Sequence, residues 1–259
     1  MAALCQKLGN VKSSSKLNRA KDGKRVIPCK GLFRDDKEKP LTAKWYETRR
    51  NIKKALSFNR ELLDKKKTVN KLWQEHENGR NSGLKVHIRA AKVVVRTMGK
   101  WVNTSKQIGP ISGTKIVDHF YWRGEYLSIV GLQHEFQRGI DYMKLINGKI
   151  LATSIVDSGR YDNVDEICSD KLVYCGEGDN PNKDQKLVRG NLALKNNMDD
   201  KMPVRVIRKV NDDGSGDRGC NYKFVYDGLF CVTEYWKEKG KFGKEIYKFL
   251  LRKCEEGDM

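Results

Sequence analysis

The sequence lacks long apolar runs. Nowhere do about 18 apolar residues follow one another, so no membrane-spanning helix is predicted. The first residues, MAALCQKLGN, contain no apolar core of the length that a secretory signal needs. Neither membrane insertion nor secretion is therefore indicated.

Paired cysteines are missing as well. The seven cysteines form an odd set without a CxxC spacing: Cys5, Cys29, Cys168, Cys175, Cys220, Cys231 and Cys254. A disulfide framework and a zinc knuckle are not expected from such a set. Reduced thiols in the cytosol or nucleus fit it better.

A recognisable catalytic set is also absent. The four histidines show no metal-binding spacing such as HExxH, and none lies near a cysteine in a nucleophile motif: His76, His87, His119 and His134. The glycine turns at Gly139–Tyr142 and Gly176–Gly178 are neither a Walker loop nor a dinucleotide fingerprint. We therefore expect no enzyme activity, no metal and no cofactor.

Negative charge is scarce in the first part of the chain. The formal net charge is +19, from 52 Lys and Arg against 33 Asp and Glu. Residues 1–108 hold 28 basic and 9 acidic side chains, whereas residues 109–259 hold 24 of each. Such an excess favours a polyanionic partner, nucleic acid before anionic membrane. The change in charge predicts a domain boundary near 105–112.

Large apolar side chains are few in residues 1–40, which are rich in Lys, Ser and Asp. We expect a disordered basic arm there. It either contacts the DNA backbone or serves only to keep the chain soluble.

Two amphipathic stretches occupy residues 41–108. Residues 44–66 place apolar side chains at helical spacing: Trp45, Ile52, Leu56, Leu62 and Leu63. Residues 84–101 carry a cleaner stripe: Leu84, Ile88, Ala91, Val95 and Met98. We expect two helices that pack together or on the domain that follows. The alternative is a helix face for a partner.

From residue 109 onward, short β-rich runs alternate with Gly, Asp and Asn breaks. The runs are KIVDHFYW, EYLSIVGL, KILATSIV, KLVYCG, PVRVIRKV, YKFVYDGLFCVTEYW and EIYKFLLRK. Many short strands with turn signals predict a β-barrel or sandwich. One helix is expected at 184–197, with its inner side formed by Leu187, Leu192 and Leu194. The fold class is therefore α+β.

Tyr161 and Tyr174 flank an acidic segment, YDNVDEICSDKLVY. A tyrosine at a strand edge is most often core or surface filler. The functional alternative is a pair of aromatic planes with an acidic or amide acceptor between them. A flipped base needs a stacking partner on each face, and the N4 amino group of cytosine needs an acceptor.

Two further segments are polar loops that could touch DNA. Gln137 and Arg138 precede the turn at Gly139, and by default they form a solvated loop tip. The segment KEKGKFGK (237–244) reads as a basic hairpin turn, by default solvated, whose alternative role is to contact phosphates.

Residues 109–252 resemble the SRA-YDG domain of plant SUVH-type histone-lysine methyltransferases and of the vertebrate hemimethylated-DNA reader of the ubiquitin-ligase class. The matching segments keep one order: GPISG, EYLSIVGLQHEFQRGIDYM, ATSIVDSGRYD, LVYCGEG, DQKLVRGNLALKNN, PVRVIRKV, FVYDGLF and EYWKEKGKFGKEIYKFLLR. FVYDGLF contains the YDG signature, Tyr226-Asp227-Gly228. Residues 44–108 are similar to the helical segment that precedes this domain in SUVH proteins.

The resemblance implies an SRA-type twisted β-barrel with flanking helices. Such a module binds double-stranded DNA carrying 5-methylcytosine and flips the modified base. Tyr161 and Tyr174 match the two stacking tyrosines, with Gly159 in the turn before the first. Gln137, beside Arg138, matches the loop residue that enters the duplex. The YDG segment is implied to be structural rather than a base contact.

The chain departs from the family pattern between the tyrosines. The family usually reads YEDDV there, with a carboxylate that binds the base. This chain reads YDNVD, so Asp162, Asn163 or Asp165 is the acceptor. The loop after Gly178 is short, so a second finger into the major groove is not expected. No SET segment and no cysteine-rich zinc cluster follow, so methyltransferase activity is not implied.

The resulting hypothesis is a chromatin reader of methylated DNA, located in the nucleus on the chromosome, with histones or chromatin proteins as further partners. Its parts are an arm at 1–40, a helical segment at 41–108 and an SRA-YDG domain at 109–259. The alternative is an SRA-fold adaptor whose DNA binding is weak or insensitive to methylation.

Overall fold

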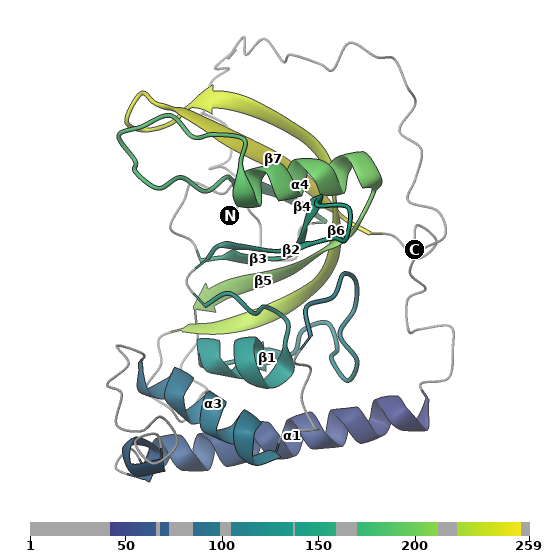
Figure 1. The fold of residues 1–259 in the computed structure, drawn as a ribbon, viewed down its shortest axis with the longest axis vertical. Helices are drawn as coiled ribbons and strands as arrows, with labels where there is room; N and C mark the ends of the chain where they lie inside the picture. Colours follow the sequence, from purple (N-terminus) through teal and green to yellow (C-terminus); the bar gives the residue numbers. More distant parts are fainter. Residues whose placement is uncertain are drawn as a thin grey trace, which may run out of the picture.

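The computed structural model describes residues 42–65, 68–72, 85–98, 105–136, 138–158, 170–211 and 222–254. Its fold is α+β, as predicted. Figure 1 shows helices α1 and α3 together at one end of the molecule and α4 against the sheet, away from them. The expected arm at 1–40 is outside the described residues. Within the described ranges, no helix is both long enough and apolar enough to cross a membrane.

The two predicted helices precede the sheet, close to their predicted limits. Helix α1 spans Ala43–Asp64, and α3 spans Val86–Met98. The side chain of Thr42 caps α1 by accepting a hydrogen bond from the backbone N–H of Trp45. The predicted stripes face inward: Trp45, Ile52, Leu62 and Leu63 on α1 and Ile88 and Ala91 on α3 are buried. Leu84 is outside the described residues.

A single seven-stranded sheet forms the centre of the molecule. Its strands are β1 (His119–Phe120), β2 (Ile140–Lys144), β3 (Ile150–Asp157), β4 (Lys171–Cys175), β5 (Val204–Asn211), β6 (Tyr222–Lys239) and β7 (Glu245–Lys253). The hydrogen-bonded order is β2-β3-β5-β6-β7-β4, and β1 pairs with β6. All pairs are antiparallel except β3 with β5.

The sheet is open rather than a closed barrel. Closure would require β2 to pair with β4, the two ends of the hydrogen-bonded path, and no such pairing exists among the described strands. The predicted barrel is therefore corrected to a twisted open sheet, while the mixed α+β class is confirmed.

Residues 125–132, predicted as a strand, instead contain the π-helix η2 (Glu125–Val130). The carboxylate of Glu125 is fully buried and accepts hydrogen bonds from Arg60 Nε and the Tyr121 N–H, both at 2.9 Å. Gly131, at φ 79°, ends the element. A short apolar run suits a buried strand and a buried helix equally, and here the ion pair with α1 favours the helix.

Three other limits differ from the predictions. The glycine turn predicted at Gly139–Tyr142 overlaps strand β2, which spans Ile140–Lys144. The run at 115–122 contributes only β1. Helix α4 spans Arg189–Asp200 rather than 184–197. The helix does not begin at 184 because Gln185 is bound to β7: its backbone N–H donates to the Glu245 carbonyl, and its Oε1 accepts from the Tyr247 N–H.

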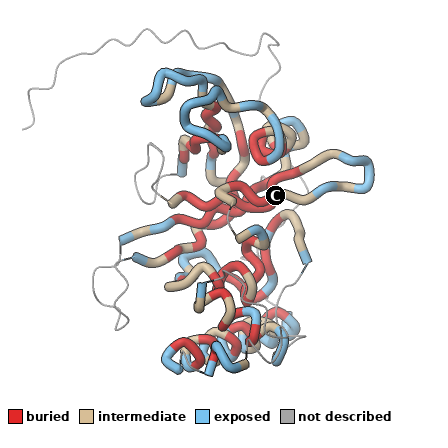
Figure 2. The backbone as a smooth tube through the Cα atoms, turned by 60° about the vertical axis from the view of Figure 1, so that its left-hand side comes forward, coloured by how far each residue is buried: buried red, intermediate tan, exposed pale blue. Residues whose placement is uncertain are grey.

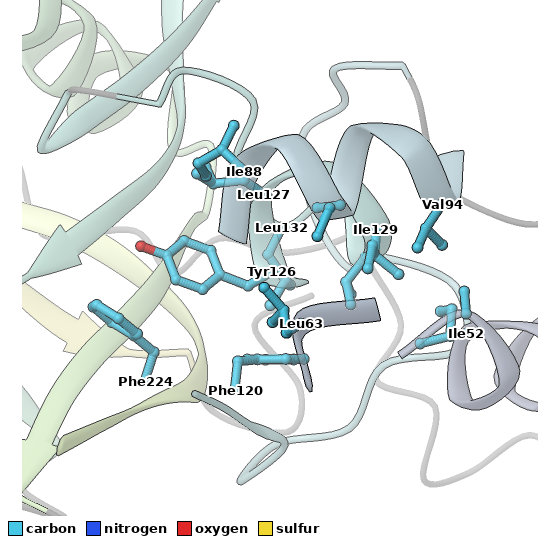
Figure 3. Close-up of a cluster of buried hydrophobic side chains, with 14 of the residues drawn as sticks. Ile52, Leu63, Ile88, Val94, Phe120, Tyr126, Leu127, Ile129, Leu132 and Phe224 are labelled. Atoms are coloured by element: carbon cyan, nitrogen blue, oxygen red, sulfur yellow. The ribbon is translucent and has the colours of Figure 1, made fainter. Parts of the chain in front are cut away.

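One hydrophobic core joins the helices to the sheet. Figure 3 shows Ile52 and Leu63 of α1 and Ile88 of α3 in one cluster with Leu127 and Ile129 of η2. The same cluster continues through Tyr126 to Phe224 of β6. The two helices therefore pack on the sheet region, as predicted, instead of leaving their apolar faces open for a partner.

A second core lies between α4 and the sheet. Ala193 and Leu194 of α4 pack with Ile155, Phe230 and Phe249. Figure 2 shows that the central strands are buried over most of their length, whereas the loops beyond them are exposed. The exposed loops therefore extend from a sheet that is packed in two hydrophobic cores.

Candidate nucleic-acid interface

Tyr174 closes strand β4 and lies in the second core. Its side chain is 4% exposed, and its backbone pairs with Phe249 of β7. The hydroxyl donates to the carbonyl oxygen of Val156 on β3 at 3.4 Å. The ring is therefore held from two strands that are far apart in the sequence.

Gly139 lies against the hydroxyl end of Tyr174. A Cβ atom added at Gly139 would be 2.7 Å from the tyrosine oxygen, closer than real Cβ atoms come to their neighbours. The Gly139 carbonyl also accepts a hydrogen bond from the Val156 N–H at 2.8 Å. The absence of a side chain thus lets the end of the 134–139 loop meet the tyrosine.

The root of this loop is fixed by two buried polar side chains. Asp141, fully buried, accepts the N–H groups of His134 at 2.7 Å and Glu135 at 3.4 Å. It also accepts Lys106 Nζ at 2.8 Å. Gln133, also fully buried, donates from Nε2 to the Arg138 carbonyl at 2.9 Å. Both arms of the loop are therefore anchored by buried side chains.

A buried arginine supports the segment that leads into the loop. Arg205 of β5 donates from Nε to the Leu132 carbonyl at 3.0 Å. Its Nη1 donates to the carbonyls of Gln107 at 2.8 Å and Gly109 at 2.6 Å. Burial lowers its pKa to about 10. Because a guanidinium has fixed donor directions, these bonds set the positions of two separate segments.

Arg138 stands at the mouth of a cleft. Its guanidinium lies over the ring of Tyr142, 4.9 Å from the ring centre. A hydrogen bond with Tyr142 raises the pKa of Arg138, so the side chain keeps its charge. It is a half-buried cation at the end of the 134–139 loop, in a place where a phosphate or a base could be contacted.

The cleft has a volume of about 530 Å³ and mixed polarity. It is lined by Arg138 and Gly139 on one side and by the 177–189 loop on the other. Glu177 is the half-buried acid in it. Burial raises the pKa of the Glu177 carboxyl, while the Gly190 N–H at the start of α4 and the nearby Arg138 act in the opposite direction.

The 176–189 loop is held by amide side chains. Asn191 accepts the Glu177 N–H at 2.9 Å and donates to the carbonyls of Glu177 and Lys186. Gln185 donates to the Gly176 carbonyl at 2.7 Å. The wall of the cleft is therefore built by side chains that replace regular secondary structure.

The model of the SAD/SRA domain family matches residues 107–257, more than half of the chain. The chain belongs to the SAD/SRA domain family.

Relatives of this SRA domain chain are longer proteins. In Arabidopsis thaliana, the H3 lysine-9 specific histone-lysine N-methyltransferase SUVH5 is 42% identical over 199 residues, which cover 72% of this chain and 25% of that protein. A YDG domain-containing protein of the same plant is 44% identical over 167 residues, covering 62% and 39%. The chain therefore spans less than half the length of these relatives.

The solved structure of the SUVH5 SRA domain in complex with methylated CHH DNA is also similar. It is 48% identical to this chain, has a TM-score of 0.50, and the match covers 57% of this chain and 93% of that one. The SRA fold and the sequence resemblance therefore agree.

The YDG segment of this SRA domain forms a β-bulge. Val206 pairs with Gly228 and Ile207 with Tyr226, so Asp227 is the extra residue. Gly228 has φ +101°, a conformation that favours glycine. Asp227 accepts Arg208 Nε at 2.6 Å and Lys253 Nζ at 3.3 Å. These contacts are structural, in keeping with the role that the resemblance implied.

Of the predicted site residues, the structure describes Tyr174 and Arg138 and brings both next to Gly139. The others are outside the described residues: Gln137, Gly159, Tyr161, Asp162, Asn163 and Asp165. Among the described residues, no group of three or more His, Cys, Asp or Glu side chains could hold a metal.

Sequence reasoning missed Asp141, Gln133 and Glu177. A usable signal was present for the first two: each is a polar side chain directly beside an apolar run, and together they bracket the loop. Glu177 carried no such signal, because its burial depends on the fold of the 176–189 loop.

Proposed function

We propose that this chain binds duplex DNA containing 5-methylcytosine and flips the modified base into a pocket walled by Tyr174 and Tyr161. The observation that carries the proposal is the meeting of the 134–139 loop with Tyr174 at Gly139. Flipping requires a loop that enters the duplex next to the pocket that receives the base. The SUVH5 SRA domain, solved with methylated DNA, supports the same reading at 48% identity.

Each site residue has a distinct role in this proposal. Gln137 enters the stack and hydrogen-bonds the orphaned guanine, while Arg138 contacts the backbone beside it. Gly159 gives the turn before Tyr161. The cytosine amino group is accepted by Asp162, Asn163 or Asp165. Asp141 and Gln133 position the loop without touching DNA.

The energies allow selectivity for the methyl group, but only a moderate one. Extruding a base costs a few kcal/mol, and stacking on each aromatic ring returns ~1–3 kcal/mol. Burying one methyl adds roughly 0.8 kcal/mol, which is a few-fold in affinity. Most of the affinity therefore comes from backbone charge, in keeping with the net charge of +19.

We further propose that the chain acts as a reader and not as an enzyme, in the nucleus and on chromatin. The SUVH5 SRA domain, solved in complex with methylated CHH DNA, supports a binding role for the module. The methyltransferase relative aligns with this chain over only 25% of its own length. Purified protein should transfer no label from S-adenosylmethionine to histones or DNA.

The decisive experiment is a binding titration at fixed salt. It compares matched duplexes that are unmethylated, hemimethylated and fully methylated, and a fluorescent base analogue at the target position reports flipping. We expect tighter binding and more flipping with a methylated site. Equal affinity for all duplexes would contradict the proposal and would indicate a methylation-insensitive DNA binder.

A further inference from the structure

Strands β6 and β7 continue beyond the sheet core as a hairpin with a basic tip. The turn is closed by backbone bonds between the Gly240 N–H and the Lys244 carbonyl at 2.8 Å, and between the Gly243 N–H and the Gly240 carbonyl at 2.9 Å. Residues 239–244 read KGKFGK, with three lysines and no acid. These lysines are exposed, and nothing lies within 4 Å of a Cβ added at Gly243.

Phe242 stands at this tip with 69% of its surface exposed. Because most of this ring stays in solvent, its burial contributes little to the free energy of folding. The stem below it is ordered by its own contacts: Lys237 pairs with Glu245 at 2.9 Å, and the Trp236 Nε1 donates to Glu238 at 2.7 Å. The stem therefore presents the ring and the lysines on a defined support.

The hairpin shares its root with the cleft. Glu245, the first residue of β7, bonds through its backbone to Asp184 and Gln185, which both line the cleft. Further along β7, Phe249 pairs with Tyr174. Phe242 is seven residues before Phe249, so at about 3.4 Å per residue the tip lies at most about 24 Å from the pocket tyrosine.

We propose that the tip at 239–244 contacts the backbone of the same duplex, roughly seven base pairs from the flipped base, since base pairs stack at about 3.4 Å. The lysines bind phosphates, and the Phe242 ring packs in the adjoining minor groove. Apolar side chains on the tips of DNA-binding ribbons insert between or against base steps in this way. The inference rests on the proposed function, because it takes the pocket as the place of the flipped base.

The composition of the tip favours DNA over an anionic membrane. Interfacial binding grows with the apolar area that is buried, and residues 239–244 offer one large apolar side chain between glycines and lysines. Phosphates at regular spacing, with a groove between them, suit three separated cations and a single ring.

The test uses the full chain and three variants. The first replaces Lys239, Lys241 and Lys244 with Gln, and the second is Phe242→Ser. The matched control replaces with Gln three exposed lysines on other elements, Lys65, Lys144 and Lys201. Each protein is titrated at several salt concentrations with a 30-base-pair duplex and an 11-base-pair duplex, both methylated at the centre.

On the long duplex, the hairpin lysine variant should lose about 2.7 from the slope of log K against log salt, at about 0.9 per phosphate. Phe242→Ser should weaken binding about fivefold or more. On the short duplex, which ends before the tip, both variants should match the wild type, and the control should match it on both.

An unchanged slope, or equal losses on the two duplexes, would overturn the inference. So would a loss of binding to phosphatidylserine vesicles with no change in DNA affinity, because the tip would then be a membrane anchor. Failure of the proposed function is separate: it would appear as equal affinity of the wild type for methylated and unmethylated DNA.

Discussion

Gly139 has no Cβ atom, and this lets the 134–139 loop, which is predicted to enter the duplex, approach Tyr174 of the predicted pocket. Gly139 does not have a positive φ, so alanine fits its backbone, and the conflict lies only with the hydroxyl of Tyr174 at 2.7 Å. The role of Gly139 can therefore be tested by relieving that one contact.

We expect Gly139→Ala to weaken binding to methylated duplex more than to unmethylated duplex, because the ring or the loop must shift. Overpacking of this kind costs about 1–3 kcal/mol. Adding Tyr174→Phe removes the clashing oxygen and should restore both stability and selectivity. Affinities for both duplexes and the Tm measure the effect. A double variant as impaired as Gly139→Ala would show that Tyr174 is not what Gly139 accommodates.

His87 makes part of the fold sensitive to acid. Burial, with help from Lys85 and Arg123, lowers its pKa from 6.5 to about 4. The ring stacks on Trp122 at 5.8 Å, and the neutral form is the one that the folded state holds.

The direction in which stability changes with pH follows from proton binding at His87. Between pH 6.5 and 4, the unfolded chain binds a proton at His87 that the folded chain does not, so stability is lost as the pH falls through this window. The Tm of wild type should therefore drop between pH 7 and 5 by more than that of His87→Phe, which keeps a ring against Trp122. Parallel Tm curves for the two proteins would assign the acid sensitivity to other groups.

At the scale of elements, the contact between α3 and η2 depends on Gly124. A Cβ there would lie 2.4 Å from the His87 carbonyl oxygen and 2.9 Å from the Ala91 Cβ. The helix backbone thus approaches the π-helix as closely as glycine permits.

Gly124→Ala should separate these elements and lower the free energy of unfolding by about 1–3 kcal/mol. Ser57→Ala, on the exposed face of α1, is the control and should leave the stability nearly unchanged. Urea titrations of both variants measure the difference. A stability equal to that of wild type would mean that α3 moves without cost.

Periodicity predicted most elements because the signals were local. The stripes of α1 and α3, the continuous buried runs of β3 and β5 and the alternation in the first part of β6 reflect side chains that face a core. Residues 125–130 escaped prediction because the partner that favours the π-helix, Arg60, lies 65 residues earlier. Strand β2 escaped because Gly139 looked like a turn signal, whereas its smallness serves the approach of Tyr174.

The candidate site was predictable only where the family pattern or residue chemistry was visible. Tyr174 was assigned from the family pattern and Arg138 from its place before a glycine turn; both lie beside Gly139, and their roles stay predictions. The anchoring by Asp141 was not visible, because a carboxylate that accepts two backbone N–H groups and Lys106 looks like any loop acid until the fold buries it.

At the scale of the whole molecule, charge and fold are distributed differently. The net positive charge belongs to residues 1–108, yet α1 and α3 within that range share a core with residues 111–132. The domain boundary near 105–112, predicted from the change in charge, stays a prediction. Across it, Arg49 forms a two-pronged ion pair with Asp118, and Arg60 pairs with Glu125.

Deleting residues 1–40, which hold 11 Lys and Arg, should weaken binding to all duplexes alike. Phosphate contacts carry no sequence or methyl information, so the ratio of affinities for methylated and unmethylated DNA should stay constant. The slope of log K against log salt should become shallower. If the slope were identical with and without these residues, the arm would make no contact with DNA.

The order of strands in the sheet has a consequence for synthesis on the ribosome. Strand β4, which carries Tyr174, has β7 as its neighbour in the sheet, and β7 is the last of the described strands in chain order. Because synthesis begins at the N-terminus, about 70 residues are added after Tyr174 before the strand that pairs with its backbone begins. A nascent chain in which the basic residues 1–108 have already been made can therefore attract nucleic acid before the proposed pocket can form. Under the proposed function, selectivity for the modified cytosine therefore depends on β7, which is made after β4.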